Sequence, residues 1–213
     1  MSRIARQIAA AAAGYVVGSV PVGVLVGRLS GGIDVREHGS HSMGTTNVLR
    51  TVGRGPAAAT LLLDIAKGAA AARIGGVVGG GRGGMAAAGL GAVVGHSWPL
   101  FAGFKGGKSS AVTFGTVAVV SPPVAAASFV GGVSALAVTR RMSLLSLVGA
   151  GFAVATAAVL GVRRHDAATP ALVIPGVAII VYRHRENINR LLRGVEPEVD
   201  MTGPSAAGAA ASH

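Results

Sequence analysis

The amino-acid sequence predicts an all-α integral membrane protein: a bundle of about seven transmembrane helices, some of them short, with three motif loops on the cytoplasmic side. Hydrophobic residues make up 51% of the 213 residues and charged residues only 13%, about half the charged share of a typical soluble domain. The 34 glycines lie among apolar runs, which suits close packing of helices in lipid. Aromatic residues are only 4%, which disfavours a membrane β-barrel with aromatic girdles.

Seven apolar stretches of the sequence are each predicted to form a membrane-spanning helix. Residues 8–26 form the first, and about 20 helical residues cross a bilayer core of about 30 Å. Ser121-Pro122-Pro123 is predicted as the turn of a helical hairpin, because proline breaks helices. The glycine run at residues 75–84 is predicted as the turn between the second and third spans. The later stretches are residues 56–72, 85–94, 112–120, 124–138, 144–162 and 170–182.

The charge of the chain indicates an anionic partner and an orientation. The net charge is +11, but the basic residues lie between apolar runs and lack interleaved aromatics. This favours anionic headgroups or phosphorylated substrates over nucleic acid. Seven spans place twelve Lys and Arg residues on one side and six on the other. The positive-inside rule assigns the richer side to the cytoplasm and leaves the N-terminus outside.

Composition also limits the chemistry and the domain count. The chain has no cysteine, which excludes disulfide scaffolds, thiol catalysis and cysteine-zinc sites. No His/Glu spacing typical of a metal site appears, so we expect neither a metal nor another cofactor. Residues 1–195 are predicted as one membrane domain, and residues 196–213, rich in Ala, Ser and Gly, as a disordered tail.

The first motif loop, residues 39–50, combines small polar residues with a cation. If a helix starts near Gly44, then Thr46, Asn47 and Arg50 share one of its faces. A helix start with hydroxyls and an arginine fork binds anions well. An N-cap followed by a solvated arginine explains the same pattern equally well.

The second motif loop, residues 95–110, contains Lys105-Gly106-Gly107-Lys108. Backbone amides between two ammonium groups suit a phosphate. Gly107-Lys108-Ser109 approaches a nucleotide-binding P-loop, but that motif needs a buried strand before it, and no strand is predicted here.

The third motif loop, residues 182–190, places His184 and Asn187 three residues apart on one helical face. On composition alone, a basic juxtamembrane patch against anionic lipid is the better explanation for it. Asp64 and Lys67 lie three apart within the second span. Such a pair is costly in a membrane unless its members face each other or a polar cavity, so we expect it to brace the bundle or support the site.

The polar residues of the three motif loops supply many cations and amides. They contain no Ser-His-Asp arrangement and no strong base. A reaction with a good leaving group needs little base assistance, because positioning and charge stabilisation lower the barrier.

These blocks resemble one family, the bacterial acyl-phosphate-dependent glycerol-3-phosphate acyltransferases, or PlsY family. The resemblance covers nearly the whole chain up to about Pro197. It rests on Gly18-Ser19-Val20-Pro21 through Arg50, with Leu63-Asp64-Ile65-Ala66-Lys67-Gly68 after it, on Gly95-His96 through Lys108, and on Tyr182-Arg183-His184 through Gly194-Val195-Glu196-Pro197.

The resemblance implies a reaction. An acyl phosphate gives its acyl group to the sn-1 hydroxyl of glycerol 3-phosphate, which yields 1-acyl-glycerol 3-phosphate (lysophosphatidic acid) and phosphate in phospholipid biosynthesis. It also implies a multi-pass protein of the bacterial cytoplasmic membrane with its site facing the cytoplasm. The implied partners are both substrates, membrane lipid and the enzyme that makes acyl phosphate. A substrate phosphate oxygen, rather than an enzyme base, assists the hydroxyl proton.

The resemblance also implies site residues by position. Arg50 and Lys108 neutralise phosphate and oxyanion charge, and His184 and Asn187 contact glycerol 3-phosphate together with Ser143. The remaining expected substrate contacts are Ser40, Gly44, Thr46, Asn47, Gly106 and Gly107. Two departures stand out: His41-Ser42 replaces the usual Gly-Asn, and Ser109-Ser110 follows Lys108 where Gly-Val is common.

Two alternatives explain part of the pattern. A transporter of a phosphorylated small solute would use similar cations near broken helices, but it needs a pathway to both faces. A non-catalytic membrane scaffold explains the arginines but not Thr46, Asn47 and His184.

Overall fold

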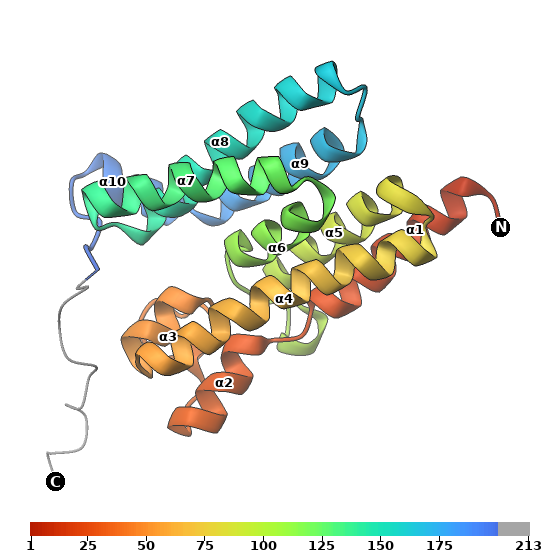
Figure 1. Cartoon of the computed structure of the whole chain (residues 1–213). Helices are drawn as coiled ribbons and strands as arrows, with labels where there is room; N and C mark the ends of the chain where they lie inside the picture. Colours follow the sequence, from red (N-terminus) through yellow and green to blue (C-terminus); the bar gives the residue numbers. More distant parts are fainter. Residues whose placement is uncertain (200–213) are drawn as a thin grey trace, which may run out of the picture.

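The structure is a computed structural model that describes residues 1–199, and within these residues all regular structure is helical (Figure 1). Seven helices run along the molecule: α1 (Arg3–Gly18), α4 (Arg54–Val78), α5 (Gly81–Ser97), α6 (Ser110–Val120), α7 (Pro122–Thr139), α8 (Met142–Arg163) and α9 (Ala168–Arg183). Shorter elements connect them: α2 (Val22–Gly31), α3 (Thr45–Thr51), α10 (Arg185–Leu192) and the 3₁₀ turns η1 (Val35–Glu37) and η2 (Leu100–Ala102).

The helices have the length and apolarity of membrane spans. Arg3–Gly31, Gly81–Ala102, Pro122–Thr139 and Met142–Arg163 are each long and apolar enough to cross a membrane, and α6 and α9 are shorter apolar helices. The 25 residues of α4 extend over about 37 Å, although this helix carries buried charges. The predicted all-α membrane fold is therefore confirmed.

Two expected boundaries are wrong in detail. The first apolar stretch, residues 8–26, is not one continuous helix, because α1 ends at Gly18 and a break at residues 19–21 precedes α2. Pro21 lacks the N–H that a continuous helix would use. The glycine run at residues 75–84 is mostly helical, since α4 continues to Val78 and α5 begins at Gly81.

Small residues let these helices approach closely. A Cβ at Gly91 of α5 would lie 2.1 Å from the carbonyl oxygen of Ala11 in α1, and one at Gly75 would lie 2.4 Å from that of Gly84. The glycines after residue 74 therefore serve helix packing more than a turn. α1, α4, α5, α6 and α9 form the tightly packed part, while α7 and α8 form a hairpin that packs on α6 and α9.

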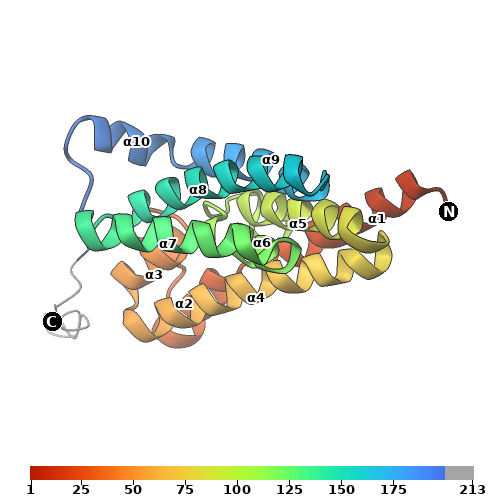
Figure 2. The same ribbon diagram turned by 45° about the horizontal axis from the view of Figure 1, so that its top comes forward.

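The topology brings the motif loops to one end of the bundle. Both ribbon views place α3, α10 and the α7–α8 turn at one end, and the N-terminus and the α4–α5 turn at the other (Figures 1 and 2). This separation agrees with the alternation of sides that seven spans predict.

The ordered domain is longer than expected. Glu196 and Val199 are buried, and the N–H of Val199 donates to the carbonyl oxygen of Arg140. The predicted boundary after residue 195 therefore lies too early. The rest of the predicted tail, residues 200–213, lies outside the described residues.

Candidate active site

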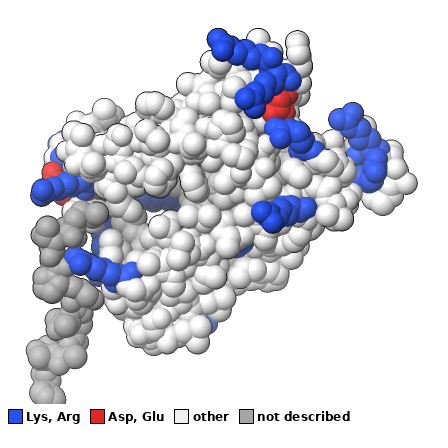
Figure 3. Space-filling view, in the orientation of Figure 1, with Lys and Arg blue, Asp and Glu red and all other residues white. Residues whose placement is uncertain are grey.

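A cavity of about 310 Å³ lies between the α7–α8 hairpin and the helices α4, α6 and α9. In the space-filling view the molecule is hollowed near the end where α3 and α10 lie, with basic side-chain atoms visible inside (Figure 3). One part of the cavity is polar and the other is apolar. The polar part includes Ser40, Gly44, Thr46, Asn47, Arg50, Lys108, Ser143, His184, Asn187, Arg190 and Glu196; the apolar part includes Phe114, Val117, Phe129, Ala150, Val173 and Val177.

Asn47 organises the first motif loop. Its side chain is 1% exposed, and Nδ2 donates to the carbonyl oxygens of Val35 (2.6 Å), His38 (3.1 Å) and Ser42 (2.8 Å). Its Oδ1 accepts from the N–H of Ser40 at 2.8 Å. Both N–H groups of the amide are thus used in contacts with protein, and the predicted contact of Asn47 with substrate stays a prediction.

The cationic residue of this loop is available to a ligand. Arg50 lies in the last turn of α3, lines the cavity and is exposed. No hydrogen bond or ion pair joins its guanidinium to another residue in the part of the chain that the structure describes. Thr46, half-buried on the same short helix, also lines the cavity.

The glycines of the second motif loop pack against protein. Arg183 donates from Nη2 to the carbonyl oxygen of Gly106 (2.8 Å) and from Nε to that of Gly107 (2.9 Å). The N–H of Gly107 donates to the carbonyl oxygen of His96 at 3.0 Å. A Cβ at Gly106 would lie 2.1 Å from that same oxygen. Neither glycine is among the residues that line the cavity. These close contacts require glycine at both positions, and their predicted contact with phosphate stays a prediction.

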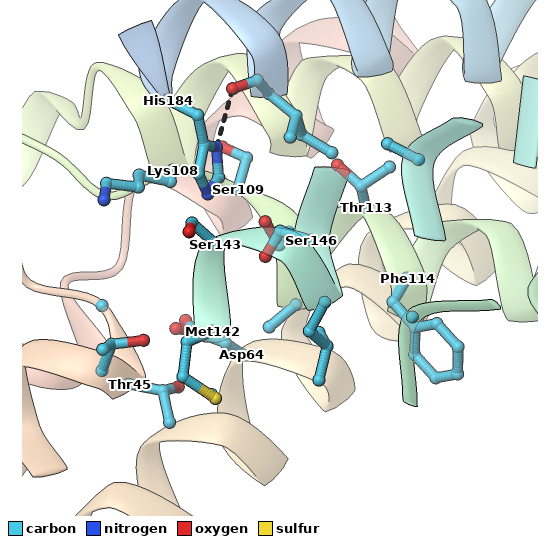
Figure 4. A pocket seen from close by; sticks show the side chains of 18 of the residues that line it. Thr45, Asp64, Lys108, Ser109, Thr113, Phe114, Met142, Ser143, Ser146 and His184 are labelled. Atoms are coloured by element: carbon cyan, nitrogen blue, oxygen red, sulfur yellow. Dashed lines mark hydrogen bonds between the residues drawn. The ribbon is translucent and has the colours of Figure 1, made fainter. Parts of the chain in front are cut away.

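His184 presents a hydrogen-bond acceptor to the cavity. It is 3% exposed at the junction of α9 and α10, and its Nδ1 lies 2.8 Å from the carbonyl oxygen of Ile180, as the dashed line in Figure 4 marks. Because a carbonyl can only accept, Nδ1 carries the proton and Nε2 is the acceptor of the neutral ring. Burial, with a smaller contribution from the charge of Lys108, lowers the pKa of His184 to about 4, so the ring is neutral at pH 7.

Lys108 begins a chain of polar contacts. Its Nζ donates to Oδ1 of Asn187 at 2.5 Å. Nδ2 of Asn187 donates to Oε1 of Glu196 at 2.6 Å, and Nε of Arg190 donates to Oε2 at 2.8 Å. Burial, and then the charge of Arg190, lowers the pKa of Lys108 to about 8. Burial alone would raise the pKa of Glu196, but hydrogen bonds from Asn187, and then from its other neighbours, hold this pKa below the ordinary value.

Sequence reasoning missed Glu196, which it assigned to the tail. The signal that could have found it is its place in Gly194-Val195-Glu196-Pro197, part of the third block of the resemblance.

Ser143 at the start of α8 has an unused hydroxyl. Its Oγ is buried and forms no hydrogen bond of good geometry with the described residues, although it lies near enough to Glu196 to lower the pKa of that carboxyl. In Figure 4 it faces the same space as Lys108 and His184.

The charged pair inside α4 faces inward as expected. Nζ of Lys67 lies 3.0 Å from Oδ1 of Asp64, 2.9 Å from the carbonyl oxygen of Val20 and 3.1 Å from Nδ1 of His96. The ammonium thus makes an ion pair with Asp64 and has two hydrogen-bond acceptors, the carbonyl of Val20 and the ring of His96. The carbonyl of Val20 lies in the break between α1 and α2, where it also accepts from the N–H of Val22 at 3.0 Å.

Both departures from the family pattern fall at unusual backbone positions. His41 has φ +55° and Ser109 has φ +63°, the left-handed region that glycine adopts most easily. Oγ of Ser109 pairs with Oγ of Ser97 (2.6 Å) and donates to the carbonyl oxygen of Val93 (2.9 Å). These contacts hold the serine in a conformation that costs a non-glycine residue free energy.

The described residues contain no group of three or more His, Asp or Glu side chains that could hold a metal ion. What the arrangement offers is cations, a neutral imidazole and hydroxyls above an apolar cleft. This combination suits an anionic headgroup joined to a hydrocarbon chain.

Comparison with known proteins points the same way. Residues 8–194 match the family model described as Glycerol-3-phosphate acyltransferase. The chain is 45% identical over 190 residues to the glycerol-3-phosphate acyltransferase of Synechococcus sp. (strain JA-3-3Ab), with 89% of this chain and 92% of that protein covered. It is 46% identical over 193 residues to that of Gloeobacter violaceus, with 88% and 92% covered.

Two solved structures share the fold. The crystal structure of PlsY (YgiH), an integral membrane glycerol 3-phosphate acyltransferase, in its glycerol 3-phosphate form has a TM-score of 0.80 and 36% sequence identity, with 94% of this chain and 96% of that chain covered. Its lysophosphatidic acid form has a TM-score of 0.80 and 35% identity, with 91% and 95% covered.

Proposed function

This chain belongs to the glycerol-3-phosphate acyltransferase family, and from that premise we propose that its acyl donor is an acyl phosphate. The acyl group passes to the sn-1 hydroxyl of glycerol 3-phosphate. The new ester bond gives 1-acyl-glycerol 3-phosphate, or lysophosphatidic acid, and the C–O bond to the donor phosphate breaks to release inorganic phosphate.

The observation that carries this proposal is the continuity of the cavity. One space of about 310 Å³ joins the cations Arg50, Lys108 and Arg190 to an apolar cleft lined by residues such as Phe114 and Val177. Two phosphate groups fit the cationic end, and the acyl chain fits the cleft. These cations gather at one end of the bundle, which favours a reaction site over a transport pathway open to both faces.

His184 is suited to orient the attacking hydroxyl. Its neutral ring offers Nε2 as an acceptor, but a pKa of about 4 makes it a weak base at pH 7. A phosphate monoester titrates at about pH 6, so a substrate phosphate oxygen is the better proton acceptor. The hydroxyl oxygen attacks the acyl carbon while its proton passes to that phosphate oxygen.

The cations lower the barrier of the transfer. As the C–O bond breaks, its electron pair moves to the leaving phosphate, and negative charge also develops on the acyl carbonyl oxygen. Lys108 and Arg50 line the space where both charges form. Fixed cations in a site that excludes water stabilise such charge strongly.

The location that fits this reaction is the bacterial cytoplasmic membrane, with the site facing the cytoplasm and the N-terminus outside. Glycerol 3-phosphate then reaches the polar end from water, and the lipid product leaves into the membrane. An enzyme that makes acyl phosphate stays a predicted protein partner.

The test is transfer by the purified protein in lipid vesicles. We expect palmitoyl phosphate and glycerol 3-phosphate together to give lysophosphatidic acid and inorganic phosphate in equal amounts, and neither substrate alone to do so. Palmitoyl-CoA in place of palmitoyl phosphate is the donor control. Transfer from the CoA ester only would overturn the donor assignment, and uptake of glycerol 3-phosphate without product would support the transporter.

A further inference from the structure

A second histidine lines the same cavity. His96, near the end of α5, is 3% exposed and belongs to the cavity wall together with Asp64. The proposed steps of the transfer do not involve this side chain. Its surroundings fix which of its ring nitrogens carries a proton.

The partner of Nδ1 decides the tautomer. Nζ of Lys67 lies 3.1 Å from Nδ1 of His96, whereas Oδ1 of Asp64 lies 3.6 Å from it. Only the first distance is that of a hydrogen bond. An ammonium can only donate, so Nδ1 accepts and the ring proton sits on Nε2. The ion pair of Lys67 with Asp64 keeps the ammonium in place.

Because residue 107 is glycine, its backbone approaches the Nε2 edge of the ring and no side chain of that residue lies against Nε2. A Cβ at Gly107 would lie 2.3 Å from Nε2 of His96 and 3.1 Å from both neighbouring ring carbons. Any side chain at this position would therefore lie directly against the N–H. Lys108, the cation assigned to phosphate charge, is the next residue along the chain.

We propose that His96 is a further substrate-binding residue, whose Nε2–H donates to a phosphoryl oxygen of the acyl phosphate, and that Lys67 is a positioning residue that fixes this tautomer. The proposal rests on the proposed function, since it names a contact to that donor. It gives the two histidines of the cavity opposite roles: His96 donates to the leaving phosphate, and His184 accepts from the attacking hydroxyl. The two partners, an ammonium at His96 and a carbonyl at His184, set this difference.

Nitrogen-15 NMR on the protein labelled at histidine tests the tautomers directly. Protonated and bare ring nitrogens have well-separated chemical shifts, and the variants His96→Gln and His184→Gln assign the two signals. We expect His96 to be protonated at Nε2 and His184 at Nδ1. A nonhydrolysable acyl phosphonate should shift the Nε2 signal of His96. A proton on Nδ1 of His96, or an unmoved Nε2 signal with the phosphonate bound, would overturn the proposal.

Kinetics of paired variants give the second test. His96→Leu removes the donor, and we expect the KM for acyl phosphate to rise about tenfold to a hundredfold, as for a lost hydrogen bond to a charged group, with the KM for glycerol 3-phosphate unchanged. His96→Gln restores an N–H donor and should recover most of the loss. His165→Leu, in the exposed turn before α9, is the matched control and should behave as wild type.

The outcomes separate the two proposals. A wild-type protein that transfers no acyl group from acyl phosphate fails the proposed function. An active wild type whose His96→Leu variant keeps its KM for acyl phosphate fails only the role of His96. If the leucine variant does not fold, the NMR of the wild-type protein decides. Lys67→Met should move the His96 ring toward a mixture of tautomers, and an unchanged ring would contradict the role of Lys67.

Discussion

Lys108 is a half-buried lysine whose charge depends on its surroundings in the cavity wall. Its ammonium lies among Asn187, Arg190 and Glu196 in the cavity wall. Burial and the charge of Arg190 bring its pKa down to about 8, close to the pH of a cell. Its charge is therefore more easily lost than that of an ordinary lysine.

This pKa predicts a pH dependence. Below pH 8 the ammonium is charged and can neutralise phosphate; above it, the charge is lost. We expect kcat/KM, which reports the free enzyme, to fall as the pH rises through about 8. Lys108→Arg keeps a charge at every accessible pH. The kcat/KM of this variant should therefore not fall near pH 8, even if its value is lower than that of the wild type. An alkaline fall that persists in the arginine variant would assign it to another group.

Removal of either cation should be costly. We expect Arg50→Ala and Lys108→Ala each to lower kcat by on the order of 10²-fold or more, because each would remove stabilisation of developing charge. Steady-state phosphate release measures the effect. Arg193→Ala, an exposed cation at the end of α10, is the control and should stay near wild type. Near-normal rates in both site variants would contradict the assignment.

The left-handed residue His41 predicts a gain in stability. His41→Gly should raise the free energy of unfolding by about 1 kcal/mol, because a non-glycine residue pays about 1–2 kcal/mol in this region and φ is +55°. The midpoint of thermal unfolding in detergent measures it. His38→Gly is the control, since His38 has an ordinary extended backbone with φ −128°, and glycine there should be neutral or destabilising. Equal shifts in both variants would argue against backbone strain.

At the scale of elements, the crossing of α4 and α6 positions the second motif loop. A Cβ at Gly115 would lie 2.0 Å from the carbonyl oxygen of Ile65, and one at Gly68 would lie 2.2 Å from that of Val112. Each helix thus presents a glycine to the backbone of the other. Because α6 begins at Ser110, any shift of this helix also moves Lys108.

This crossing gives a prediction with a close control. Gly115→Ala should cost about 1–3 kcal/mol of stability through overpacking and lower activity as well. Gly151→Ala, in α8, meets no atom within 4 Å and should cost nothing. Thermal midpoints and phosphate release, measured together, check both. A stable and active Gly115→Ala variant would show that α6 can move without harm to the site.

The helices could be predicted from hydropathy, but their ends could not. Mean hydropathy indicates how much of the chain lies in lipid. A single proline between valines leaves the mean hydropathy of Arg3–Gly31 high, so this measure does not show the break after Gly18. The glycines near residue 80 suit a turn or a tight helix contact equally well by composition. The close approach of α5 to α4 shows that these glycines serve mainly as helix contacts.

The roles of the site residues, like the ends of the helices, depend on contacts that local sequence does not show. Arg50, Lys108 and His184 could be predicted from local pattern, and the structure brings them to one cavity. The roles of Asn47 and His96 depend on partners more than a few residues away, such as Val35 for the first and Lys67 for the second. Local sequence carries no trace of such pairings.

At the scale of the whole molecule, seven spans predict that the two ends of the described chain lie on opposite sides of the membrane. The absence of cysteine allows single-cysteine labelling without background. We expect a membrane-impermeant maleimide to label Ser2→Cys from outside intact cells. Arg193→Cys should be labelled only after the cells are opened. The reverse pattern would invert the orientation, and labelling of both from outside would contradict an odd number of spans.

The contact of Glu196 with Asn187 and Arg190 has a consequence for the order in which the cavity is completed during synthesis of the chain. Arg50 and Lys108 are synthesised early, whereas His184, Asn187 and Glu196 leave the ribosome last. The apolar part of the cavity also needs residues of α7, α8 and α9, such as Phe129, Ala150 and Val177. The cavity is therefore complete only when translation has nearly finished.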